Sequence, residues 1–170
     1  MSDLRAQLED ALQGRVCVMG VGNVDHGDDG FGVCLAETLA ADGVPDVKVV
    51  GKSPERWVGR VAEEGFDTIL FLDAVDFGST SGSLLLLDGR GIEARFPQIS
   101  THKISLGLLA RCVEGKGATR AWLLGVQPES LHPSAGLSPR LETTLRALCE
   151  LLCEVLARRP AEAVAGGQTQ

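Results

Sequence analysis

The sequence has 170 residues, a formal net charge of −7 and hydrophobic side chains at 44% of its positions. This apolar fraction suffices for one domain with a buried core, which excludes a disordered chain and a small disulfide-stapled scaffold. The negative charge argues against a nucleic-acid partner and against an anionic membrane surface, because both attract a basic face.

Short apolar runs alternate along the chain with longer segments in which apolar residues recur at helical spacing. Strands are predicted at 15–20, 47–50, 68–72, 83–87 and 121–126. Helices are predicted at 30–41, 54–64, 103–113 and 138–157, with Ser53 as the N-cap of the second and a loop from 88 to 100. Continuously apolar strands are typical of parallel sheets that are covered by helices on both faces. The expected fold is therefore α/β, a three-layer αβα sandwich on a mostly parallel five-stranded sheet.

Three segments follow from this pattern. Residues 1–14 are expected to be a helical or flexible lead-in. Their charged side chains exclude a secretory signal peptide. Residues 15–158 are expected to form the single α/β domain, and residues 159–170, rich in Pro, Ala, Gly and Gln, are expected to be disordered. No membrane partner is expected, since no apolar run approaches the roughly 18 residues of a membrane helix. The default expectation for the oligomeric state is a monomer.

The five cysteines form no C-x-x-C pair and favour a reduced, cytoplasmic chain. Cys149 and Cys153 lie one turn apart in the last predicted helix. Two thiols at this spacing suit a metal, but their apolar surroundings favour the interpretation that both are small buried hydrophobic residues.

Polar residues gather where the predicted strands end, which is where open α/β sheets bind ligands. The strand-end residues are Asn23, Asp25, His26, Asp28 and Asp29 after the first strand, Asp73 and Asp76 after the third, His102 before the third helix, and Gln127, Glu129 and His132 after the fifth. The segment Gly20-Val-Gly22-Asn23 resembles the start of a dinucleotide fingerprint. However, Asp25 replaces the third glycine, the aspartates of this loop would repel a pyrophosphate, and no Walker A motif occurs, so nucleotide binding is disfavoured.

Asp29, Asp73 and His102 form a candidate metal-binding set. Each residue also has a structural explanation: Asp28 or Asp29 can cap the following helix, Asp73 can bind backbone N–H groups of the next turn, and His102 can be a buried structural histidine. Two carboxylates and one imidazole suit Ni²⁺, Zn²⁺, Co²⁺ or Mn²⁺. Neither H-E-x-x-H nor G-x-S-x-G occurs. The residues alone therefore indicate an α/β domain with a divalent-metal cleft.

Five motifs in register at the strand ends carry a family resemblance. They are Gly20-Val-Gly22-Asn23, Gly27-Asp-Asp29-Gly-Phe-Gly32, Leu72-Asp73-Ala-Val-Asp76-Phe-Gly78, Ser100-Thr-His102-Lys and Leu124-Gly-Val-Gln-Pro128-Glu129. From Arg15 to Leu156 the chain resembles the hydrogenase maturation proteases, endopeptidases that trim the C-terminal extension from the large subunit of [NiFe] hydrogenases.

The resemblance implies that Asp29, Asp73 and His102 are both the catalytic and the metal-contacting residues. It implies that they recognise nickel already inserted into the large-subunit precursor, the expected partner, so that the isolated protein holds no tightly bound cofactor. Cleavage is then expected on the C-terminal side of a basic residue.

Two features depart from the family pattern. Asp25 and His26 stand where relatives usually have apolar or neutral residues, so this loop either adds a ligand or is simply exposed. Relatives often carry an acidic residue at the end of the second strand, where this chain has Val49, Val50 and Gly51.

The expected mechanism uses water as the nucleophile, with the docked metal polarising the carbonyl or lowering the pKa of the water. Asp28 or Asp76 is the expected general base, although Asp76 also suits a turn before Phe77. Glu129 either lines the substrate cleft or faces solvent. The alternative function is a metal-sensing, chaperone-like protein that binds the precursor without cutting it.

Overall fold

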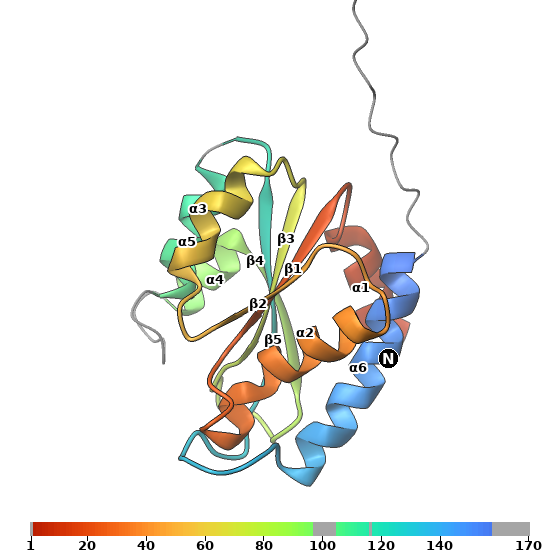
Figure 1. The fold of residues 1–170 in the computed structure, drawn as a ribbon, viewed down its shortest axis with the longest axis vertical. Coiled ribbons are helices and arrows are strands. Elements are labelled where there is room, and N and C mark those ends of the chain that lie inside the picture. The colour runs from red at the N-terminus through yellow and green to blue at the C-terminus, as the bar shows by residue number, and fades with distance from the viewer. Residues whose placement is uncertain (1, 97–104, 116, 158–170) are drawn as a thin grey trace, which may run out of the picture.

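A five-stranded sheet divides the molecule into two layers of helices (Figure 1). The computed structural model describes residues 2–96, 105–115 and 117–157. The strands are β1 (Val16–Val21), β2 (Val47–Gly51), β3 (Thr68–Ala74), β4 (Leu84–Asp88) and β5 (Arg120–Val126). They are ordered β2-β1-β3-β5-β4, and only β4 runs antiparallel to its neighbour. The predicted α/β class with a mostly parallel five-stranded sheet is confirmed.

Among the described residues, three helices cover each face of the sheet. The helices are α1 (Ser2–Ala11), α2 (Phe31–Ala41), α3 (Glu55–Glu63), α4 (Gly89–Arg95), α5 (Leu106–Glu114) and α6 (Pro139–Ala157), and the short 3-10 helix η1 (Gly27–Gly30) precedes α2. In Figure 1, α1, α2 and α6 lie on one side of the sheet and α3, α4 and α5 on the other. Each layer packs on its own hydrophobic core.

The central strand β3 is continuously apolar in sequence because both of its faces are buried. Leu70 and Leu72 point into the core under α2 and α6, whereas Ile69 and Phe71 point into the core under α3 and α5. Because side chains alternate across a strand, both faces of β3 must be apolar. The same alternation puts Asp73 on the face that α3, α4 and α5 cover.

Two local predictions are wrong. The segment after residue 88 is a helix, α4, rather than a loop: Asp88 accepts a hydrogen bond from the Gly91 N–H at 2.8 Å as its N-cap, and Ile92 is fully buried. Gly89 and Gly91 interrupt the helical pattern in the sequence and hide this element. In α3, Pro54 rather than Ser53 occupies the N-cap position.

The N-terminal helix α1 packs on the same core as α6. Leu8 and Leu12, in α1 and just after it, are fully buried in the core that α6 shares. Residues 159–170 lie outside the described residues, so their predicted disorder stays a prediction. Within the described part of the chain, no helix has the length and apolar character needed to cross a bilayer.

Candidate active site

The start of α2 lies directly against the ends of two strands because Gly32 has no side chain. A Cβ atom at this position would overlap the carbonyl oxygens of Leu72 and Val21. A Cβ at Gly22, whose φ is +138°, would likewise overlap the carbonyl oxygen of Asp29. Gly22 and Gly32 thus allow the loop after β1 to lie against the end of β3.

This contact brings Asp29 and Asp73 to the same edge of the sheet. Asp29 lies in η1, is 2% exposed and accepts a hydrogen bond from the Asn23 N–H at 3.1 Å. Asp73 is the second-last residue of β3, is also 2% exposed and lies opposite Gly125 of β5. Ligands bind at the carboxyl ends of the strands in open α/β sheets, so two carboxylates at this edge are candidates for a cation-binding site.

His102, the third predicted ligand, lies outside the described residues. The first described residue after it is Ser105, whose hydroxyl oxygen accepts a hydrogen bond from the Leu108 N–H at 3.2 Å and caps α5. The assignment of Asp29, Asp73 and His102 as a joint metal-binding and catalytic set stays a prediction.

Asp28 has a structural role that its position in the sequence did not show. Its carboxylate accepts hydrogen bonds from the Glu129 N–H at 2.8 Å, the Ser138 N–H at 2.7 Å and the Ser138 hydroxyl at 3.0 Å. The side chain is 3% exposed. It thus joins the loop after β1 to the start of α6, where a negative charge is favoured by the helix dipole. A carboxylate with both oxygens occupied is a poor general base.

The cap of α2 also differs from the prediction. Gly30 holds the N-cap position, so neither Asp28 nor Asp29 caps this helix there. No signal near Asp28 in the sequence could have identified Ser138, because the two residues are 110 positions apart.

The loop after β5 pairs with the loop after β1 through backbone groups. The Gly27 N–H donates to the Ser134 carbonyl at 2.9 Å, and the Ser134 N–H donates to the Asp25 carbonyl at 3.2 Å. An isolated parallel bridge joins His26 to Ser134. Asp25 is exposed and His26 is half-buried, which agrees with the interpretation of this loop as a surface feature.

Gln127 organises the loop that follows β3. Its side-chain oxygen accepts hydrogen bonds from the Phe77 N–H at 2.9 Å and the Ser79 N–H at 3.1 Å, and its side-chain nitrogen donates to Asp76 at 3.0 Å. Asp76 also accepts a bond from the Gly78 N–H at 3.1 Å. The hydrogen bond from Gln127, followed by that from Gly78, lowers the pKa of Asp76. Asp76 therefore forms the predicted turn, and its lowered pKa makes it a weaker base.

Two adjoining hollows lie beside these loops. The first measures about 370 Å³ and is lined by Asp76, Gln127 and residues 128–132. The second measures about 330 Å³ and lies between Asp28 and residues 134–139. Glu129 is exposed and lines both, so the interpretation as a cleft residue suits it. Neither hollow is lined by Asp29 or Asp73, which are both buried. Asp28, which lines the second hollow, is the neighbour of Asp29 in the sequence.

A comparison with known families shows which family the chain belongs to. Residues 33–155 match the model of a family described as hydrogenase maturation protease. The chain belongs to the hydrogenase maturation protease family. It is therefore a peptidase, a hydrolase that processes hydrogenases, and the predicted family and enzyme class are confirmed.

The chain is also similar in sequence and in structure to individual members of the family. The chain is 30% identical over 158 residues to the hydrogenase 2 maturation protease of Escherichia coli K12, covering 88% of this chain and 95% of the relative. It is similar in structure to the [NiFe] hydrogenase maturation protease HycI of Thermococcus kodakarensis, with a TM-score of 0.78, 32% identity, and coverage of 89% and 99% of the two chains. The hydrogenase maturating endopeptidase HybD of E. coli follows with a TM-score of 0.72, 26% identity, and coverage of 85% and 93%.

Proposed function

We propose that the chain removes the C-terminal extension from a [NiFe] hydrogenase large-subunit precursor after nickel insertion, and that it recognises the inserted nickel. Family membership supports the peptidase activity. The observation that carries the nickel-recognition step is the pair of buried carboxylates, Asp29 and Asp73, at the edge of the sheet where the parallel strands end. In this proposal nickel belongs to the substrate.

Asp29, Asp73 and His102 bind the substrate's nickel in this proposal and so hold the adjacent peptide bond in one orientation. Carboxylate oxygens and an imidazole nitrogen are suitable ligands for Ni²⁺. Water attacks the scissile carbonyl carbon, the C–N bond breaks, and a new carboxylate and a new amino group are released. The metal supplies polarisation of the carbonyl or activation of the water.

We further propose that the protein acts as a monomer in the cytoplasm. All five cysteines are free thiols, which suits a reducing compartment.

The test compares nickel-loaded with nickel-free precursor, each incubated with the purified chain and followed by mass spectrometry. We expect loss of the C-terminal extension from the loaded form alone. Equal cleavage of both forms would contradict recognition of nickel, and binding without any mass change would support the chaperone-like alternative.

Single variants separate the proposed ligands from their neighbours. Asp29→Asn, Asp73→Asn and His102→Ala should each abolish processing while leaving the far-UV circular dichroism spectrum unchanged. Asp25→Asn is the matched control, because Asp25 is an exposed carboxylate in the same loop as Asp29, and it should process at the wild-type rate. Normal processing by His102→Ala would overturn the proposed set.

A further inference from the structure

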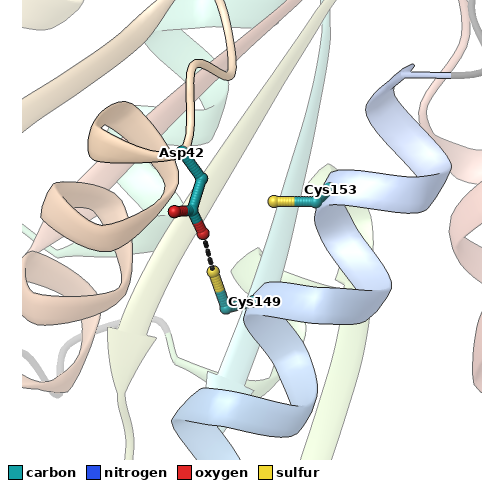
Figure 2. A group of neighbouring side chains, drawn as sticks. All are labelled: Asp42, Cys149 and Cys153. Atoms are coloured by element: carbon teal, nitrogen blue, oxygen red, sulfur yellow. Dashed lines mark hydrogen bonds between the residues drawn. The ribbon is translucent and has the colours of Figure 1, made fainter.

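A second group of metal-ligating side chains lies at the opposite end of α2 from the candidate active site. Asp42 follows the last residue of α2 as its C-cap, and Cys149 and Cys153 lie one turn apart on α6. Figure 2 shows the three side chains pointing into a common space between the two helices. Because α2 is 11 residues long, about 16 Å of helix separates this group from η1 and Asp29.

The sequence favoured the interpretation of both cysteines as buried hydrophobic residues. The burial agrees in part, since Cys149 is 5% exposed and Cys153 is half-buried. A hydrophobic role does not explain the carboxylate beside them: the Cys149 thiol donates a hydrogen bond to Asp42 Oδ2 at 3.3 Å. Asp42 itself is exposed, so the group is closed on the core side and open to solvent on the other.

The spacing of the three ligand atoms is close to that of a tetrahedral metal site. One ligand atom from each of Asp42, Cys149 and Cys153 lies within 4.8 Å of the other two. With metal–sulfur bonds of about 2.3 Å and metal–oxygen bonds of about 2.0 Å, tetrahedral geometry separates sulfur from oxygen by about 3.5 Å and the two sulfurs by about 3.8 Å. The Cys149–Asp42 distance of 3.3 Å already approaches the first value. Side-chain rotation of the half-buried Cys153 can supply the remaining adjustment.

Two thiolates and one carboxylate favour a different class of ion from the oxygen-rich set at the strand edge. Thiolate ligands select borderline-soft divalent ions such as Zn²⁺, and a zinc ion with three protein ligands takes water or a substrate at its fourth position. The exposed side of Asp42 leaves room for that water. Burial of Cys149, followed by its bond to Asp42, raises the pKa of this thiol to about 12, so the metal-free chain holds it protonated. Binding of the ion therefore releases the Cys149 proton.

We propose that Cys149, Cys153 and Asp42 bind a zinc-class divalent cation that joins the C-terminal end of α2 to α6. The N-terminal ends of the same two helices are already linked, because Asp28, in η1 before α2, accepts hydrogen bonds from Ser138, which precedes α6. The cation thus provides a second link between α2 and α6. It stabilises the fold because the unfolded chain does not hold the three ligands together. This site is independent of the proposed processing reaction.

The test uses the full chain, purified with a reductant and stripped of metal. Cd²⁺ is the spectroscopic probe, because thiolate–cadmium charge transfer absorbs in the ultraviolet, and Zn²⁺ affinity is measured by competition with a chromophoric chelator. We expect one equivalent of Cd²⁺ to produce the thiolate band, and saturating Zn²⁺ to raise the midpoint of thermal unfolding.

Matched variants assign the ligands. Cys153→Ser and Asp42→Asn should weaken Zn²⁺ binding by on the order of tenfold or more, and Cys153→Ser should also reduce the thiolate band. Cys112→Ser is the control thiol, since Cys112 is exposed on α5, and it should behave as the wild type. Asp29→Asn should keep the band, which distinguishes this site from the proposed nickel contacts.

Two results would overturn the proposal. The first is a wild-type chain that shows no thiolate band and no thermal shift at a metal concentration tenfold above that of the protein. The second is an unchanged Zn²⁺ affinity in both Cys153→Ser and Asp42→Asn. Because Cys153 is half-buried and Asp42 is exposed, both variants should fold, and their circular dichroism spectra verify this.

Discussion

The carboxylate of Asp28 accepts hydrogen bonds from both the backbone N–H and the hydroxyl of Ser138, at 2.7 Å and 3.0 Å. This contact joins the loop that carries Asp29 to the residue that precedes α6. Asp28 and Ser138 also both line the second hollow. The two adjacent aspartates of η1 thus differ in their surroundings: Asp28 links two loops through hydrogen bonds, and Asp29 lies at the strand edge.

Replacing Asp28 by Ala should lower the free energy of unfolding by about 2 kcal/mol, because it leaves partly buried N–H groups of Glu129 and Ser138 without a charged acceptor. Urea denaturation measures this change. Asp25→Ala, in the same loop but exposed, should alter stability by less than about 0.5 kcal/mol. Equal effects of the two variants would show that the link to Ser138 does not stabilise the fold.

Gly32→Ala should destabilise the protein by about 2–3 kcal/mol, because the added Cβ overlaps backbone atoms that cannot rotate away. Gly59→Ala is the matched control, since Gly59 is also helical and has no atom within 4 Å of the position of an added Cβ. That variant should be more stable than the wild type by about 0.5–1 kcal/mol. Thermal unfolding compares them, and a harmless Gly32→Ala would contradict the close approach of α2 to β3.

The pKa of Asp76 should lie below its ordinary value of 3.8 and should rise in Gln127→Glu, which keeps an acceptor for the Phe77 and Ser79 N–H groups, loses the donor to Asp76 and adds a like charge beside it. Side-chain NMR during an acid titration measures it. Because the folded-state pKa is depressed, the stabilisation is complete above the unfolded-state pKa and is lost as the pH falls through the folded-state value. The exposed Gln13→Glu serves as the control. An unchanged Asp76 titration in Gln127→Glu would contradict the assigned hydrogen bond.

Cys17 and Cys112 should differ strongly in their reaction with iodoacetamide at pH 8. Cys17 is fully buried in β1, and burial raises the pKa of its thiol to about 12, so only about 10⁻⁴ of it is thiolate at this pH. Cys112 is exposed and should be alkylated in the folded protein. Peptide mass spectrometry measures both sites, and unfolding in urea should make them equal. Rapid labelling of folded Cys17 would contradict its place in the core.

The sequence by itself determined the α/β class, the strand positions and the family, because these follow from local periodicity and from short motifs at strand ends. It also singled out Asp29 and Asp73, since a carboxylate that ends an apolar strand is visible in one dimension. It did not show α4, because Gly89 and Gly91 interrupt the apolar pattern.

Only the tertiary structure decided which side chains meet. The partner of Asp28 is 110 residues away, and Asp42 reaches Cys149 across a gap of 107 residues. Gln127 and Asp76 come together because β3 and β5 are neighbours in the sheet. Such contacts depend on how helices and strands pack. Local patterns record whether a residue is buried, but they do not record which distant group it faces.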